Sequence, residues 1–444
     1  DEDRDLVVGT DLFRDFDNRG RGYNYEIGGD VDFPLGPGRL KLIGLERFNH
    51  NTQNSTSLFD YADDTPTEGS RFFALGDSGE RIGRGEFRWA MLGGDWQLDA
   101  EAAFNRLDQI SQLFILQPDG EFEEIPFPGG SGGVTEDRYE AILTHSRPLA
   151  GNLTMILGAG GEYSKLAQTG PGGLTREFWR PKGSLTLGWT PGNNWDLSLK
   201  LARTVGQLNF GDFLAQVFLQ NENENAGNAE LVPTQTWEAD LEIKKGLGKW
   251  GSSTLTLYSR WYEDYIDIIP LPGGGESSGN IDTAQLYGVR LNSTINLDPI
   301  GFKGAKLEIG GRLEETSIRD PLTMETRSFS NHYDRSVEIS IRHDVPGSSW
   351  AWGAGFQYDH ALPFYRLSEV ALDYEGPIYT WAFVEHKDVF GLTVNFQVFN
   401  LTDGRALFDR TVFDGLRTEA PILFTEHRNM SVQPIFRFQV RGSF

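Results

Sequence analysis

The chain has 444 residues, a formal net charge of −24 at pH 7 and no cysteine. The acidic balance argues against nucleic acid as a partner, because phosphate binding requires a basic surface. The lack of cysteine excludes disulfides, thiolate metal sites and a cysteine nucleophile. A run of about 18 apolar residues, which a transmembrane helix needs, is also absent.

Segments in which apolar and polar residues alternate recur along the chain. Side chains on a strand point to opposite faces in turn, so each segment predicts a strand with one apolar and one polar face. The polar faces carry many charges and amides, as the wall of an aqueous lumen requires. The clearest segments are residues 5–14, 23–33, 195–201, 237–244, 289–296, 336–342, 392–398 and 436–444.

Short turns alternate with long polar stretches between these strands. The turns contain Gly, Pro and Asn, the residues of tight hairpins, at 36–38, 93–94, 150–152, 191–193, 246–248, 298–301, 346–348 and 389–391. The long stretches are 49–79, 113–133, 209–234 and 269–282.

This alternation predicts an all-β fold, a closed antiparallel transmembrane β-barrel of about 18–22 strands with short periplasmic turns and long extracellular loops. A β-propeller is the alternative, since its blades repeat at about 50 residues. A blade packs four short strands into that length, whereas each interval here resolves into two strands of about ten residues.

The last strand is the most informative single segment. Phe436, Phe438 and Phe444 share one face with other apolar residues, while Arg437 and Arg441 lie on the other. An apolar face directed outward and a polar face directed inward, ending on an aromatic residue, are typical of the closing strand of a bacterial outer-membrane barrel.

No sequence motif indicates an enzyme. The zinc-protease, serine-hydrolase, phosphate-loop and EF-hand patterns are all absent, so we expect no catalytic residue. A ligand-binding surface is predicted on the third long stretch, which combines aromatics, amides and carboxylates. Its candidate residues are Asn209, Phe210, Asp212, Phe213, Glu222, Asn223, Glu224 and Asn225. The same composition also fits an exposed loop without a ligand.

Two further groups of residues carry expectations. Asp60, Asp63 and Asp64 lie close together in an acidic loop, and clustered carboxylates suit hard cations such as Ca²⁺; a solvated loop is the alternative. Otherwise we expect no cofactor. Charges on the polar strand faces are expected to face the lumen, among them Arg290, Arg342, Arg437 and Arg441.

Four motifs resemble the C-terminal barrel of TonB-dependent receptors. Residues 225–238 (NAGNAELVPTQTWE) are similar to the segment that enters a mid-barrel strand in that family, and 284–290 (AQLYGVR) resembles its "YGVE" strand. Residues 395–403, with VFNLTD, resemble its "NLfD" signature, and 437–444 resembles its terminal strand. The motifs occur in the family's order.

The resemblance implies a multi-pass barrel in the bacterial outer membrane that imports a scarce nutrient such as a siderophore, a metal complex or an oligosaccharide. Its partners would be outer-membrane lipid and lipopolysaccharide, and an inner-membrane energy-coupling complex acting through a plug domain. No segment here resembles that plug or the energy-coupling box. We therefore interpret residues 1–444 as barrel, with the plug and up to four strands missing from this chain.

Two other functions stay open at this stage. One is a plugless passive or export channel derived from the family, and the other is a structural barrel that holds a surface assembly. The lumen is expected to be filled by a plug, an inserted loop or a partner chain, since an open pore of this bore would leak solutes.

Overall fold

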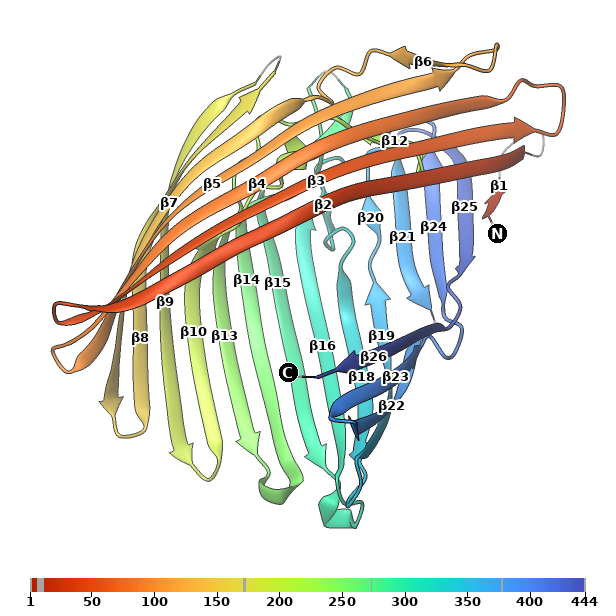
Figure 1. Ribbon diagram of the computed structural model, residues 1–444. Coiled ribbons are helices and arrows are strands. Elements are labelled where there is room, and N and C mark those ends of the chain that lie inside the picture. The colour runs from red at the N-terminus through yellow and green to blue at the C-terminus, as the bar shows by residue number, and fades with distance from the viewer. Residues whose placement is uncertain (1, 6–11, 171–172, 273, 377, 443–444) are drawn as a thin grey trace.

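The computed structural model describes residues 2–5, 12–170, 173–272, 274–376 and 378–442. Antiparallel strands dominate them and curl into a tall, barrel-shaped wall (Figure 1). The predicted all-β, antiparallel class is thereby confirmed. Within the described residues, no helix is long and apolar enough to cross a bilayer.

The wall is an up-and-down meander in which each strand pairs with the next wall strand along the chain. In order, its strands are β2 (Leu12–Leu35), β3 (Gly38–Tyr61), β4 (Glu68–Met91), β5 (Gly94–Leu116), β7 (Gly132–Ala150), β8 (Leu153–Thr169), β9 (Thr175–Gly192), β10 (Trp195–Val205), β13 (Gln235–Gly246), β14 (Gly251–Pro270), β15 (Glu276–Asn296), β16 (Ala305–Arg319), β18 (Tyr333–Asp344), β19 (Trp350–Ala361), β22 (Tyr379–Val389), β23 (Leu392–Phe399) and β26 (Ile435–Arg441).

A second sheet of five strands continues the last part of the wall. Its order is β1 (Glu2–Asp5), β25 (Ile422–Ser431), β24 (Arg405–Phe413), β21 (Glu369–Gly376) and β20 (Phe364–Tyr365). Short elements complete the structure: β6 (Phe122–Ile125), β17 (Thr326–Arg327), the hairpin β11 (Gln216–Phe218) and β12 (Asn223–Asn225), and the 3₁₀ turns η1 (Phe210–Phe213), η2 (Gly248–Trp250) and η3 (Asp298–Ile300).

All the predicted short turns lie at one end of the wall, here called the turn end, and the longer connections lie at the opposite loop end. The turn between β4 and β5 shows why such turns are short. Leu92 and Gly93 both have positive φ, at 56° and 72°, as a two-residue type I′ hairpin requires. This turn geometry matches the right-handed twist of the paired strands.

Two of the predicted long loops are mostly strand. Residues 49–79 are divided between β3 and β4, which pair as far as Phe59 and Glu68, and residues 269–282 mostly extend β14 and β15. The expectation of strands of about ten residues was wrong here. In β3, polar residues occupy both faces from Asn49 to Ser57, and in β4 the adjacent Phe72 and Phe73 place apolar side chains on both faces. The alternation that marks a strand therefore fades although the ladder continues.

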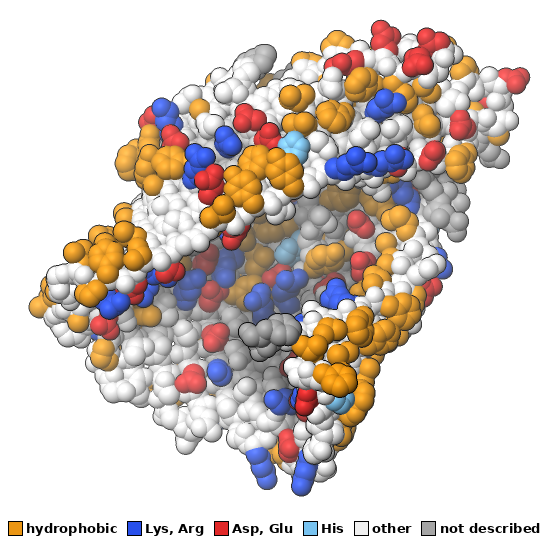
Figure 2. Space-filling model, in the orientation of Figure 1, with side chains coloured by type: hydrophobic (Ala, Val, Ile, Leu, Met, Phe, Trp, Pro, Cys, Tyr) orange, Lys and Arg blue, Asp and Glu red, His pale blue; other side chains and the backbone are white. Residues whose placement is uncertain are grey.

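The two faces of the wall differ as the alternation predicts. On the outside, Leu241 pairs with Leu199 and Leu257. The residue before Leu241, Asp240, points to the inside, where its carboxylate lies 2.7 Å from the guanidinium of Arg260. Figure 2 shows charged side chains of both signs on the hollowed inner surface.

The wall does not close along its whole height. β2 pairs with β3 and β26 pairs with β23, but within the described residues no ladder joins β2 to β26. We call this gap, visible in Figure 1, the seam. Nearer the loop end, β1 pairs with β25. The expected hydrogen-bonded closure is thus not seen at the seam.

A local break explains why the last strand leaves the line of β25. Gln433 has a φ of 58°, and Pro434 has no N–H to donate, so the ladder is interrupted between β25 and β26. Phe444 and residues 6–11, for which strand positions were predicted, lie outside the described residues.

Candidate functional site

The connection between β10 and β13, residues 206–234, crosses the inside of the wall at the loop end. We call it the mouth loop. It contains η1 and the β11–β12 hairpin. Its first and last parts contact the inner face of β7 to β9, and its tip reaches β2 and the β20–β25 sheet on the far side of the interior.

A small hydrophobic core fixes the base of the mouth loop. Leu208, Phe213 and Leu231 from the loop pack against Val134 and Leu166 of the inner wall. Burying each such side chain stabilises the contact by about 1.5–3 kcal/mol, so the base is held firmly.

Four arginines far away in sequence hold the tip of the mouth loop: three lie on strands, and Arg366 lies in the connection between β20 and β21. They donate to main-chain oxygens and to two amide side chains of the loop, and we call this set the arginine clasp. Its bonds are Arg14 Nη2 to Leu219 O (2.6 Å), Arg410 Nη1 to Asn221 O (2.6 Å), Arg428 Nη1 to Asn221 Oδ1 (2.9 Å), and Arg366 Nη2 to Glu224 O (2.7 Å) and to Asn225 Oδ1 (2.5 Å).

Buried carboxylates hold the clasp arginines in place. Arg410 Nε lies 2.6 Å from Glu426, and its Nη1 lies 3.4 Å from Glu369. The side chains of Arg410 and Glu426 are 2% and 0% exposed. Burial raises the pKa of the Glu369 carboxyl. An isolated buried charge would be costly, so these groups depend on one another.

The clasp accounts for four of the predicted ligand-binding residues. Glu222 lies 3.4 Å from Arg14, and Asn223 donates to Glu369 at 3.4 Å. Glu224 and Asn225 accept from Arg366, as given above. The structure therefore brings these residues together as the attachment of the loop tip to the wall.

The other four predicted residues lie at η1, and two of them line a cavity. The Asn209 Oδ1 accepts from the Gly211 N–H at 3.1 Å, which caps the turn. Phe213 is buried in the base core, and burial raises the pKa of Asp212. Asn209 and Phe210 line the cavity beneath the loop.

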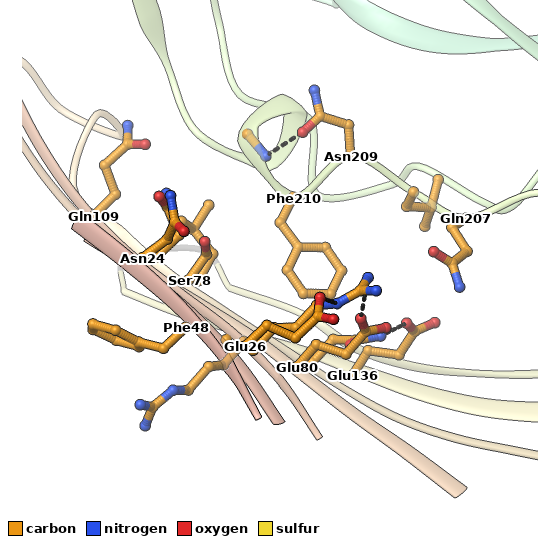
Figure 3. A pocket seen from close by; sticks show the side chains of 18 of the residues that line it. Asn24, Glu26, Phe48, Ser78, Glu80, Gln109, Glu136, Gln207, Asn209 and Phe210 are labelled. Atoms are coloured by element: carbon orange, nitrogen blue, oxygen red, sulfur yellow. Dashed lines mark hydrogen bonds and ion pairs between the residues drawn. The ribbon is translucent and has the colours of Figure 1, made fainter. Parts of the chain in front are cut away.

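This cavity, of about 740 Å³, lies between the underside of the mouth loop and the wall strands β2 to β7. We call it the mouth cavity. Phe210 points down toward a group of charged side chains on the wall (Figure 3). Arg47 lies in that group, 2.6 Å from Glu26 and 3.5 Å from Glu80.

Amide side chains form most of the remaining polar lining. Asn105 donates to Glu136 at 3.1 Å, so this carboxylate already has one partner. The other lining amides are Asn24, Asn49, Gln109, Gln207 and Asn209. A cavity of this volume lies within the roughly 300–1,000 Å³ typical of small-molecule sites.

The arginines predicted to face the lumen share the inner face of the wall. Arg342 and Arg441 line one small cavity near the turn end, and Arg342 lies 2.7 Å from Glu385 there. Arg290 lies 5.3 Å from the ring centre of the inward-facing Tyr258, and Arg437 lies 4.9 Å from that of Phe399.

The acidic loop at 60–64 does not gather its carboxylates. Asp60 accepts from the Thr67 hydroxyl at 2.6 Å, and Asp63 accepts from the Thr65 N–H at 3.0 Å. In the described part of the chain, no group of three or more His, Cys, Asp or Glu residues is placed to hold a metal ion. The Ca²⁺ site stays a prediction without geometric support.

A second charged network fixes the connection between β16 and β17 at the loop end. Asp320 accepts from Arg327 Nε at 2.6 Å and from Arg417 Nη2 at 2.5 Å. Its other oxygen accepts from the N–H groups of Leu322 and Thr323, both at 2.9 Å. These bonds hold the pKa of Asp320 well below its usual range, against the opposing effect of burial.

The depressed pKa predicts how stability depends on pH. A carboxyl with a lowered folded-state pKa contributes stability above its unfolded pKa of about 3.9, and this is lost as pH falls toward the folded value. The Asp320→Asn variant should therefore melt lower than the wild type at pH 5–8, and the gap should narrow below about pH 4. Asp95→Asn, at an exposed site, is the matched control. Equal melting of both variants at pH 7 would contradict the prediction.

Sequence reasoning missed the arginine clasp. Arg410 and Asn221 are 189 residues apart, and no local pattern links them. A weak signal was present in β25, where Glu426 and Arg428 place opposite charges on one strand face. Their burial could not be foreseen without knowing that the mouth loop covers them.

The fold and site define a class: a barrel-type wall with a polar interior, whose mouth is crossed by a folded loop. Comparison with known proteins then gives the family. Residues 2–409 match the family model described as TonB dependent receptor-like, beta-barrel. The chain belongs to this family of outer-membrane receptors and transporters. A search of curated proteins found no match.

Solved structures support the fold at low sequence identity. The copper transporter OprC has a TM-score of 0.57 and 11% identity, covering 95% of this chain and 81% of its own. The ferric-catecholate import receptor Fiu from K12 E. coli has a TM-score of 0.53 and 11% identity, and the match covers 97% of this chain and 79% of Fiu. The FrpB iron transporter from Neisseria meningitidis has a TM-score of 0.56 and 12% identity, and the match covers 93% of this chain and 71% of FrpB.

Proposed function

We propose that this chain forms the wall of an outer-membrane receptor that imports a scarce nutrient without chemical change. The observation that carries the proposal is the mouth cavity, which lies between the polar inner face of the wall and a loop fixed on both sides of the interior. Membership of the receptor family and the transporters among its structural neighbours support it. These proteins are receptors and transporters, which favours a non-enzymatic role.

Two rows of aromatic side chains on the outer face support a position across a bilayer. Near the loop end, rings contact one another from β5 to β9, with Tyr163 and Trp179 at 4.6 Å. Near the turn end, Trp89 and Trp96 are 6.2 Å apart. Aromatic girdles of this kind flank the apolar band of membrane barrels.

The separation of the two rows suits the thickness of the apolar band. Trp179 and Trp189 lie on the same face of β9 and are both exposed. At a rise of about 3.3 Å per residue the segment between them is about 33 Å long, which a tilt of 35–45° reduces to about 25 Å. The loop end would face the exterior and the turn end the periplasm.

The seam requires a partner in this setting. An unpaired strand edge in hydrocarbon leaves N–H and C=O groups unsatisfied, and each costs several kcal/mol. We propose that further strands complete the barrel between β2 and β26. A plug in the lumen would couple the receptor to the inner-membrane energy complex, and the mixed charge of the inner wall suits a folded polar plug.

Transport by the native complex tests this proposal. Uptake of the nutrient by cells that express the protein should stop when a protonophore collapses the inner-membrane gradient, because import depends on energy coupling. The complex purified from its own membrane should show little conductance in planar bilayers, since the mouth loop and the plug obstruct the interior. A large, steady conductance, or uptake that survives the protonophore, would indicate a passive channel instead.

A further inference from the structure

We propose that the mouth cavity binds an uncharged, polyhydroxylated ligand, an oligosaccharide, rather than an anionic metal chelate. This inference rests on the proposed import function and narrows its substrate class. It comes from the charges and hydrogen-bonding groups that line the cavity and from Phe210, the aromatic residue that the mouth loop contributes; Tyr25 and Phe48 of the wall also border the cavity.

The charge of the lining disfavours an anion. Three carboxylates, Glu26, Glu80 and Glu136, face the cavity, and Arg47 already bonds the first two. Arg106 also borders the cavity, but it neighbours Asn105 on β5 and so lies on the opposite, outer face of that strand. Lys and His are absent from the described lining. A negative lining of this kind repels anionic ligands.

The polar groups suit hydroxyls. A hydroxyl donates one hydrogen bond and accepts others, so it needs partners of both kinds. Carboxylates supply acceptors, and side-chain amides supply a donor and an acceptor at one site. Gln207 offers an amide from the loop side, and Asn24 and Asn49 offer amides from the wall, whereas the Asn209 amide is bonded to Gly211 and Asp212 within the loop. A sugar between them would have partners above and below.

Phe210 provides the apolar surface that a sugar ring also needs. One face of a pyranose carries C–H groups, which pack on an aromatic ring while the hydroxyls bond around the edge. Phe210 hangs from η1 into the cavity and points toward Glu26 and Glu80 on the wall (Figure 3). It contacts the base core beside Phe213, with ring centres 6.5 Å apart, so its position is fixed.

Binding of neutral glycans by the native complex tests the inference. The complex in detergent would be applied to an array of neutral and charged glycans, and ferric citrate and a ferric tricatecholate would be titrated separately. We expect neutral oligosaccharides to bind and the anionic chelates to fail. Affinity for the neutral ligand should change little between low and high salt, because screening acts only on charges.

Variants of Phe210 locate the bound ligand. Phe210→Leu keeps the contact with the base core but removes the aromatic face, and should weaken glycan binding about tenfold. Phe210→Trp keeps an aromatic face and should bind the glycan about as the wild type does. A purely structural role for Phe210 would not predict this difference between Leu and Trp. Trp350→Leu, at an exposed site near the turn end, is the control and should bind as the wild type does.

The outcomes separate the two proposals. Tight binding of an anionic chelate, or glycan binding unaffected by Phe210→Leu, would overturn the inference while leaving nutrient import intact. Absence of any neutral glycan from the bound set would also overturn it. If energy-dependent uptake itself fails, the proposed function falls as well.

Discussion

Replacing Arg410 with alanine should release the tip of the mouth loop and destabilise the loop end by about 3 kcal/mol. Removing one partner of a buried ion pair typically costs about 3–5 kcal/mol. The lower end applies because Arg428 still bonds Glu426, at 2.7 Å, after Arg410 is lost. Glu369 then keeps only Asn223 among its direct side-chain partners in the described structure.

Hydrogen exchange on the native complex measures this effect. Amides of the β11–β12 hairpin should exchange faster in Arg410→Ala, because the carbonyl of Asn221 loses its donor. Arg405→Ala is the matched control on the same strand. Arg405 is 44% exposed and lies 4.0 Å from Asp403, so its loss should cost at most about 1 kcal/mol. Equal protection of the hairpin in both variants would contradict the clasp.

A second substitution separates the loop contact from the charge balance. Adding Glu369→Gln to Arg410→Ala removes the carboxylate that was left without an arginine. Stability should then recover in part, while the hairpin stays exposed to exchange because the bond to Asn221 is still missing. If stability and the protection of the hairpin amides both recovered, charge balance alone would hold the loop.

The strands and turns were predictable because each rests on a local pattern. The alternation at 237–244 fixes which residues face outward. The pair Gly93 and Gly94 marks a tight turn, although the two turn residues prove to be Leu92 and Gly93. The pattern failed at 49–79, where β3 is polar on both faces, β4 carries apolar residues on both faces, and the strands continue without the alternation. Strand length beyond the apolar band depends on pairing with neighbours, which a single segment does not reveal.

The site was predictable only in outline. Aromatic and amide residues marked the mouth loop as unusual, and Asn209 and Phe210 do line the cavity. The sequence could not separate Phe210 from Phe213, although one faces the cavity and the other the base core. That difference depends on Val134 and Leu166, which contact the loop from strands far away in sequence.

Leu241→Arg should destabilise the barrel by about 2–4 kcal/mol, the cost of an arginine on the lipid face near the midplane. Leu241 lies on the outer face, paired with Leu199 and Leu257. It stands between Trp237, toward the loop end, and Lys245, which pairs with Trp195 toward the turn end. The new guanidinium would thus be held in hydrocarbon, where it has no counter-charge to bond.

The neighbouring residue supplies the control, because consecutive side chains face opposite sides of the wall. Glu242→Arg places the same arginine on the inner face, where water and nearby charges such as Asp240 surround it. Urea titration of the native complex in lipid vesicles should show a lower midpoint for Leu241→Arg and little change for Glu242→Arg. The reverse order would mean that the register is inverted. Equal midpoints would mean that this face does not contact lipid, and the position across the bilayer would then be wrong.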